Sequence, residues 1–278
     1  MTELPDHVAI MVVDTKGFSR HNDVQQEELQ QQLYQALEDA FHRCGLSDVW
    51  DARLFPDSTG DGYMIGFPPR HLPRVIDSYF DALQQELTSK LRRLRAGGMS
   101  LRMRLSLEYG PADHQTDDRF GSPVGNTMIG THRLVDSDPV RDLLDRSDPD
   151  VTLLAVVLSE RVMKDVVRGG HTQRHGPSEF VEVTVTMAKK GFAEPAFLYV
   201  PVISGDLLRH GLGGARPADR PKPVGKTVPK PSRGVRASSR GIAAGGNIGN
   251  IDQSRQETTV HGDQFNAHDI SIRGERRQ

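Results

Sequence analysis

The order of apolar and polar positions along the chain predicts strands and helices in alternation. Residues 8–13 form a continuous apolar run, which is typical of a strand buried on both faces. Residues 24–43 and 72–95 place apolar side chains three to four positions apart, so each segment is expected to form an amphipathic helix. Residues 100–109 alternate apolar and polar positions, as in a strand with one face towards water.

Two more strands are expected between these helices, at 50–56 and 62–67, joined by a turn rich in Asp and Gly. The resulting order, βαββαβ, is that of the ferredoxin-like fold, in which an antiparallel sheet carries both helices on one face. We therefore predict an α+β fold with a ferredoxin-like core, additional helices and a C-terminal hairpin. The additional elements are expected at 126–146 (helix), 152–158 (strand), from 159 onward (helix), and at 179–187 with 196–202 (hairpin).

Charge and composition divide the chain near residue 204. Of 35 Lys and Arg and 37 Asp and Glu, residues 205–278 hold 13 and 7, which leaves 22 and 30 in residues 1–204. Pro, Gly and basic residues dominate 205–245, and too few apolar residues remain there to offset the entropy lost on ordering. We predict a folded domain over 1–204, a linker over 205–245 and a low-complexity tail over 246–278, with the linker and the tail disordered.

The linker and the tail differ in the partners that they suggest. Residues 246–251 repeat Gly-Asn-Ile, and short Gly/Asn/Gln-rich stretches with alternating Ile are typical of polar β-stacking segments. The tail is expected either to recruit a protein partner by stacking or to stay unstructured. Residues 216–240 hold eight Lys and Arg against one acidic residue but lack aromatic side chains, so a solvated linker is favoured over nucleic-acid binding.

Several classes of protein are excluded. The longest apolar run, residues 151–158, is too short to cross a bilayer, and the N-terminus lacks the basic start and cleavage site of a signal peptide. Cys44 is the single cysteine, which excludes an intramolecular disulfide and a cysteine-rich zinc site. His171 and His175 lie in a glycine-rich loop and are weak zinc candidates. We expect a cytoplasmic protein without a membrane partner.

Asp14 and Asp61 are candidate metal ligands. Asp14 ends the first predicted strand and Asp61 lies in the turn between the second and third, and the first and third strands of a ferredoxin-like sheet are neighbours. Two carboxylates meeting there suit Mg²⁺, and two ions roughly 3.5–4 Å apart can assist a phosphoryl displacement. The alternative is that Asp14 only ends a strand and Asp61 only forms a turn. The Lys16-Gly17-Phe18-Ser19 turn could hold phosphate oxygens through its N–H groups.

Four segments resemble, in order, the motifs of one family. Residues 13–19 (Val-Asp-Thr-Lys-Gly-Phe-Ser) are similar to its opening D-I-x-G-F-T, and residues 57–63 (Asp-Ser-Thr-Gly-Asp-Gly-Tyr) to its K/E-x-x-G-D motif. Residues 125–134 (Gly-Asn-Thr-Met-Ile-Gly-Thr-His-Arg-Leu) resemble G-x-x-V-N-x-A-x-R-L, and residues 190–199 resemble the closing K-G-x-x-E-P-x-x-x-Y hairpin. The family is that of the class III nucleotidyl cyclases, the catalytic domains of adenylate and guanylate cyclases, and the match spans residues 8–202.

The resemblance implies an activity and a site. Members of the family convert a nucleoside triphosphate into a 3′,5′-cyclic nucleotide and pyrophosphate with two Mg²⁺ or Mn²⁺ ions. In this family the catalytic arginine acts on nucleotide held by the partner subunit, so a homodimer with composite sites is implied. By resemblance, the metal ligands are Asp14, Asp61 and the Thr15 carbonyl, the phosphate-binding residues are Gly17, Phe18 and Ser19, and the catalytic residue is Arg133.

Three positions depart from the family's motifs. Ile129 stands where the family has a ribose-positioning asparagine, and an isoleucine side chain forms no hydrogen bond. Ser122 and Asp57 stand at the two base-reading positions, and the short Asp57 carboxylate could accept from a guanine edge or from the amine of cytosine. Two functions remain open. One is an active cyclase in signalling, including antiviral defence that uses pyrimidine cyclic nucleotides. The other is a catalytically decayed module that dimerises and recruits partners through its tail.

Overall fold

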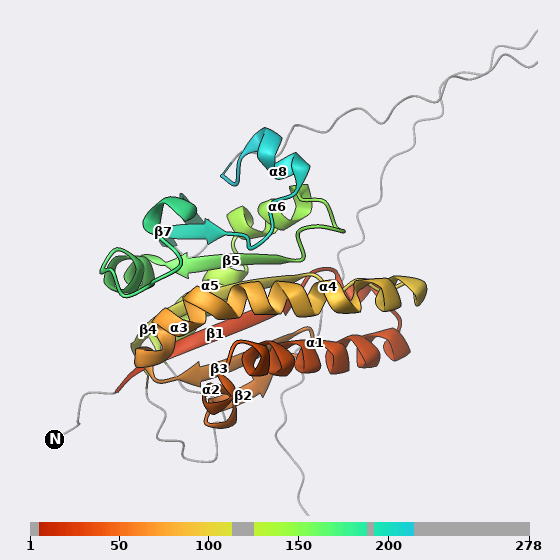
Figure 1. The fold of residues 1–278 in the computed structure, drawn as a ribbon, viewed down its shortest axis with the longest axis horizontal. Helices are drawn as coiled ribbons and strands as arrows, with labels where there is room; N and C mark the ends of the chain where they lie inside the picture. The colour runs from red at the N-terminus through yellow and green to blue at the C-terminus, as the bar shows by residue number, and fades with distance from the viewer. Residues whose placement is uncertain (1–5, 113–124, 188–191, 214–278) are drawn as a thin grey trace, which may run out of the picture. The chain divides into compact units, whose positions relative to one another are not determined.

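The computed structural model describes residues 6–112, 125–187 and 192–213. Their centre is a seven-stranded sheet with the strand order β2-β3-β1-β4-β5-β7-β6 (Figure 1). No helix in these ranges combines the length and the apolar character that crossing a membrane requires. The strands are β1 (His7–Thr15), β2 (Leu54–Ser58), β3 (Gly62–Phe67), β4 (Met103–Pro111), β5 (Leu154–Ser159), β6 (Val181–Met187) and β7 (Phe192–Tyr199). The helices are α1 (Asp23–Arg43), α2 (Ser47–Asp51), α3 (Leu72–Arg74), α4 (Phe80–Ala96), α5 (Asn126–Val135), α6 (Asp138–Arg146), α7 (Glu160–Val162) and α8 (Gly205–His210). Short 3-10 and π segments are η1 (Phe18–Arg20), η2 (Pro69–His71), η3 (Val75–Tyr79), η4 (Met163–Val167) and η5 (Pro177–Glu179).

The first four strands form the ferredoxin-like core that the sequence predicts. β1 lies between β3 and β4 and is antiparallel to both, and β2 forms the sheet edge beside β3. α1 and α4 lie side by side across one face of this sheet (Figure 1). The prediction of an α+β fold with a βαββαβ core is therefore confirmed.

The alternation along β1 decides which side of the sheet each residue faces. Ala9 and Met11 are buried in the cluster that contains the apolar stripes of α1 and α4. Val8 and Ile10 are buried in a separate cluster with Met128 of α5. β1 is apolar at every one of these positions because helices cover both of its faces.

The second half of the sheet extends this core. β5 is parallel to β4, β7 is antiparallel to β5, and β6 pairs with β7 as the predicted hairpin. The complete sheet is therefore mixed rather than wholly antiparallel. The helix predicted from Ser159 is also present, and the Ser159 hydroxyl caps it by accepting from the Val162 N–H at 3.2 Å.

Two predicted elements are placed differently from expectation. The strand expected at 50–56 begins only at Leu54, because the preceding residues form α2 and bury Trp50 against Phe41, with ring centroids 5.4 Å apart. The helix expected at 126–146 is two helices. Ser137 adopts an extended backbone between them, and Pro139 lies in the first turn of α6, where its missing N–H costs no helical hydrogen bond.

The folded region continues past the boundary predicted at residue 204. α8 buries Leu207 in a cluster with residues of α6, β5 and β7. Arg146 donates to the carbonyls of Gly211 and Leu212 at 3.0 and 2.7 Å. One short helix, α8, therefore lies within the residues predicted to form the linker. The rest of the linker and the tail lie outside the described residues, so the expectations for them stay predictions.

Candidate functional site

The structure brings the backbones of Asp14, Thr15 and Asp61 together at one end of β1. Asp14 lies opposite Gly62 in the β1–β3 register. The Thr15 N–H donates to the Asp61 carbonyl at 2.8 Å, which ties the β2–β3 turn to the end of β1. The first and third strands are thus neighbours, as the sequence predicts. Their pairing brings Asp14 and Asp61 to the same end of the sheet.

Gly62 is required for this close approach. A Cβ at residue 62 would overlap the Val13 carbonyl oxygen and would lie 2.7 Å from the Thr59 hydroxyl oxygen. Within the turn, Gly60 has a φ of +86°, a conformation that residues with a Cβ rarely adopt. Gly60 and Gly62 are therefore needed for the backbone conformation of the turn, independently of any function of the Asp61 side chain.

Arg104 is a residue of this region that the sequence analysis missed. It lies directly opposite Asp14 in the β1–β4 register, and the two side chains form an ion pair. Both are mostly buried, with 12% of the Arg104 side chain and 16% of the Asp14 side chain exposed. Burial lowers the pKa of Arg104, and the nearby charge of Arg141 adds to this effect. Pairing the predicted strand at 100–109 with the first strand would have placed a basic residue beside Asp14.

The turn that follows β1 contains the residues predicted to bind phosphate. Gly17 has a φ of +72° and precedes the 3-10 segment η1, which contains Phe18 and Ser19. Lys16 anchors this turn through its backbone and through its side chain. The Lys16 N–H donates to the Arg102 carbonyl at 2.8 Å, and the Lys16 ammonium group lies 2.5 Å from the Asp145 carboxylate.

The two base-reading positions are only partly described. Asp57 lies on the edge strand β2 opposite Met64, immediately after an irregularity in the β2–β3 pairing. Phe55 causes this irregularity, because it has a φ of +35° and its ring covers Gly66, where any Cβ would overlap it. The bulge sets the register of Asp57 relative to β3. Ser122 lies outside the described residues.

Arg133 and Ile129 belong to a second region, a cavity of about 940 Å³ beside α5. β4, α5, α7 and β7 supply its walls. Ile129 is 44% exposed, which is unusual for so large an apolar side chain in this fold. The charged residues that line the cavity are Glu108, Arg133, Glu160, Arg161 and Glu194.

Glu108 is the most buried acid of this cavity. One of its carboxylate oxygens accepts from the Ser159 hydroxyl at 2.8 Å and from the Tyr109 N–H at 3.0 Å. Burial raises the pKa of Glu108, and these hydrogen bonds oppose that rise in part. The cavity therefore contains a buried acid whose pKa lies above its ordinary value, and the arginine predicted to act in catalysis lines the same cavity.

The residue types at the end of β1 fit a hard divalent cation, but they do not leave both carboxylates open. Carboxylate and carbonyl oxygens are the ligands that Mg²⁺ and Mn²⁺ prefer, and Asp14, Asp61 and the Thr15 carbonyl supply them. Asp14 is already neutralised by Arg104. Within the described ranges, no group of three or more His, Cys, Asp or Glu side chains could hold a metal ion.

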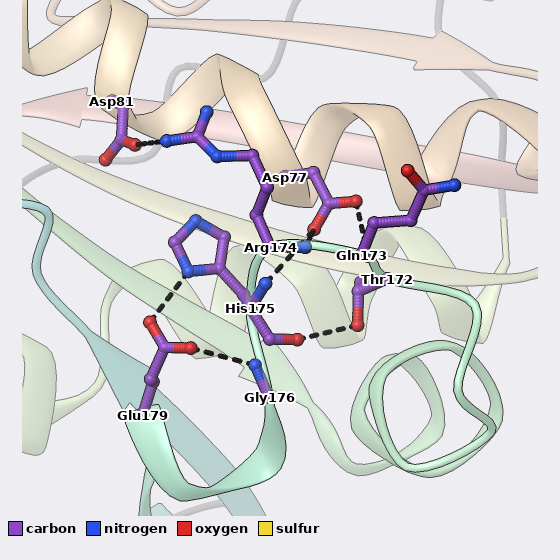
Figure 2. A network of polar contacts seen from close by, with 8 residues as sticks. All are labelled: Asp77, Asp81, Thr172, Gln173, Arg174, His175, Gly176 and Glu179. Atoms are coloured by element: carbon purple, nitrogen blue, oxygen red, sulfur yellow. Dashed lines mark hydrogen bonds and ion pairs between the residues drawn. The ribbon is translucent and has the colours of Figure 1, made fainter.

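His175, one of the two weak zinc candidates, is part of a structural loop contact. Figure 2 shows the Asp77 carboxylate accepting from three successive backbone N–H groups, those of residues 173, 174 and 175, at 2.7, 3.0 and 3.3 Å. His175 is 8% exposed, and its Nδ1 pairs with Glu179 at 2.8 Å (Figure 2). His171 takes no part in this network, so the two histidines do not share a site.

Comparison with known proteins gives a likeness in structure. No model of a known protein family matches the chain, and no curated protein matches it in sequence. The guanylyl cyclase Cya2 is 15% identical, with a TM-score of 0.49, over 77% of this chain and 100% of that one. The adenylyl cyclase CyaB from P. aeruginosa is 14% identical, with a TM-score of 0.45, over 72% and 96%. The guanylate cyclase domain of RhGC from Catenaria anguillulae, solved in complex with GTP, is 14% identical, with a TM-score of 0.43, over 73% and 100%.

At these identities the matches concern the fold, and they assign no activity, metal or partner to this chain. The three structures are of guanylyl and adenylyl cyclases, so the likeness does not favour either nucleotide. In structure, the chain is a divergent match to the catalytic domains of class III adenylyl and guanylyl cyclases, the family that its motifs resemble.

Proposed function

We propose that the chain is a nucleotidyl cyclase-like enzyme that converts a nucleoside triphosphate into a 3′,5′-cyclic nucleotide and pyrophosphate. The observation that carries this proposal is the pairing of β1 with β3, which joins Asp14 and Thr15 to Asp61 through the 2.8 Å hydrogen bond between Thr15 and Asp61. Motifs far apart in the sequence thereby meet at one end of the sheet.

In this proposal the end of β1 binds the triphosphate. Asp14, Asp61 and the Thr15 carbonyl would hold Mg²⁺ or Mn²⁺, which supplies positive charge at the phosphoryl oxygens. The backbone of Gly17, Phe18 and Ser19 would hold phosphate oxygens, because a turn that begins with a left-handed glycine is a backbone form that can bind anions through its N–H groups.

The cavity beside α5 would supply the remaining groups from a second copy of the chain. Arg133 would offset the negative charge that develops on the phosphorus, which is the kind of electrostatic effect that contributes most to catalysis. A homodimer is required, because the resemblance implies that this arginine acts on nucleotide held by the partner subunit. Ile129 offers the ribose no hydrogen bond, and misplacement of a substrate by about 1 Å can cost around 100-fold in rate.

Asp57 would contact the base of the substrate in this proposal. A carboxylate accepts hydrogen bonds, so it suits the donor groups of guanine or the exocyclic amine of cytosine. Asp57 alone does not name the base, because the exocyclic amine of adenine is a donor as well. A pyrimidine product would suit signalling in antiviral defence.

A second candidate function is a cyclase-fold module without turnover, which dimerises and recruits a partner through its tail. Two observations favour it. Arg104 pairs with the acid predicted to bind metal, and the exposed Ile129 replaces a residue that should bind ribose.

One experiment separates the two candidates. The full chain is incubated, at concentrations that ensure dimers, with each of ATP, GTP, CTP and UTP and with Mn²⁺ or Mg²⁺, and the products are resolved by mass. A cyclic nucleotide from at least one of the four triphosphates is the expected result. The absence of any cyclic product from all four would overturn the enzyme proposal and leave the second candidate, a cyclase-fold module without turnover.

A further inference from the structure

The two acids at the end of β1 differ in their surroundings. Asp14 forms an ion pair with Arg104, and both side chains are mostly buried. The Asp61 carboxylate has no ion-pair or hydrogen-bond partner within the described ranges. One acid is therefore already neutralised by the protein, and the other is open.

The other acids near Arg104, Asp136 and Asp145, act on its charge but are each paired with another basic residue. Asp136 pairs with Arg141 at 2.6 Å, and Asp145 pairs with Lys16 at 2.5 Å. Arg104 is fixed opposite Asp14 by the β1–β4 register, at the separation at which cross-strand side chains meet. Breaking this mostly buried pair would leave an uncompensated charge in a poorly hydrated place, so the pair should persist.

We propose that Arg104 is the permanent cation of the Asp14 carboxylate, so that the free chain binds a single divalent ion at Asp61 and gains a second only when Arg104 is removed. The reason is electrostatic. A divalent ion on Asp14 would lie beside a guanidinium in a poorly screened site, where like charges repel strongly. This inference rests on the metal role proposed for Asp61, and it removes Asp14 from the metal ligands of the free chain.

The inference changes how the site would neutralise a triphosphate. A guanidinium can donate two parallel hydrogen bonds to a carboxylate or to a phosphate, so Arg104 can place positive charge where a second ion would otherwise lie. It cannot ionise water or exchange with solvent as a metal does. The site would then need one divalent ion per chain rather than two.

Mn²⁺ binding without nucleotide tests the inference. Free Mn²⁺ is counted by electron paramagnetic resonance during a titration of the full chain into the millimolar range. The wild type should bind one Mn²⁺. Arg104→Met, which keeps the length of the side chain and removes its charge, should bind two, or bind Mn²⁺ about tenfold more tightly or better. Arg141→Met is the matched control, because it removes a nearby positive charge but leaves the Asp14 pair intact, and it should stay within about twofold of the wild type.

Two carboxylate variants locate the ion. Asp14→Asn should keep the single wild-type site, whereas Asp61→Asn should lose it. Two ions bound by the wild type with similar affinity would overturn the inference, as would an Arg104→Met protein with unchanged stoichiometry and affinity. If Arg104→Met does not fold, Arg104→Lys keeps the charge and should still bind one ion, and a second ion on that variant would count against the proposal.

The readout is independent of turnover. A chain that binds Mn²⁺ as stated and makes no cyclic product would overturn the proposed enzyme and leave the role of Arg104 standing. A chain that makes product and binds two ions beside an intact Arg104 would support the proposed enzyme and overturn the role of Arg104.

Discussion

The end of β1 and the cavity beside α5 differ in what each retains of the motifs that the chain resembles. At the end of β1, the acids, the glycines and the turn are all present, and the backbone holds them together through Thr15, Asp61 and Gly62. In the cavity, Arg133 is present, but Ile129 replaces a polar residue and 44% of it is exposed. The first region is constrained by its own backbone, because replacing Gly62 disturbs the sheet. The second is lined by side chains that can change without disturbing the fold.

This difference suggests where a change of substrate or a loss of turnover would begin. Asp14 and Asp61, the side chains proposed to hold metal, lie in or beside the β1–β3 pairing, so they are expected to resist change for structural reasons. The positions proposed to hold ribose and base lie on a cavity wall or on an edge strand, where a substitution is expected to cost little stability. The following predictions test this contrast, from the largest expected effect to the smallest.

Asp61→Ala should reduce cyclic product formation by about 100-fold or more, because it removes the open carboxylate on which the divalent ion depends. Product is measured by mass with the nucleotide that the wild type uses. Asp51→Ala, at an exposed acid at the end of α2, is the control and should retain the wild-type rate. Turnover near the wild-type rate in Asp61→Ala would show that the metal assignment is wrong.

Gly62→Ala should lower the free energy of unfolding by about 1–3 kcal/mol, because its Cβ has no room beside the Val13 carbonyl. The measurement is chemical denaturation. Gly176→Ala is the matched control. No atom lies within 4 Å of a Cβ at that position, so its effect should stay within about 0.5 kcal/mol. Equal stabilities for the two variants would show that the backbone at Gly62 is not constrained, and the contrast between the two regions would then lose its basis.

Ile129→Asn should raise cyclic product formation about tenfold, because an amide in the cavity can bind and position the ribose hydroxyls. The exposure of Ile129 predicts that stability changes by less than about 0.5 kcal/mol. Val24→Asn, at an apolar residue of α1 that is 77% exposed, should leave the rate unchanged. No gain in rate with Ile129→Asn would argue that the cavity does not meet the substrate as proposed.

Glu108→Gln should change stability in a pH-dependent manner, and this is the smallest effect. Burial raises the pKa of Glu108 in the folded state above its ordinary value of 4.5. The contribution of Glu108 to stability is therefore fully present below pH 4.5 and is lost as the pH rises through the folded-state pKa. Glutamine stays neutral, and its oxygen can accept from both Ser159 and Tyr109.

The variant should accordingly be more stable than the wild type at pH 7 and about equally stable near pH 4. Denaturation curves at the two pH values measure this difference. A stability difference that does not depend on pH would show that Glu108 is ionised as readily in the folded chain as in the unfolded one.

The sequence by itself determined the order of the strands and helices in the core. Apolar periodicity reports local burial, so residues 8–13, 24–43 and 62–67 could be assigned without knowledge of their neighbours. The motif resemblance identified candidate functional residues, including Asp14, Asp61 and Arg133. Where burial depended on packing between elements, periodicity alone did not place the element boundaries. Trp50 forms part of a helix that packs on Phe41 of α1, and Leu207 is buried among residues of α6, β5 and β7.

Only the tertiary structure decided the surroundings of each candidate residue. The pairing of β1 with β4 places Arg104 opposite Asp14, although 90 positions separate them in the chain. The cavity around Arg133 is assembled from β4, α5, α7 and β7, so no single segment indicates it. Charge pairing and burial depend on distances in space rather than along the chain. The residues of the site could therefore be named from the sequence, whereas their electrostatic state could not.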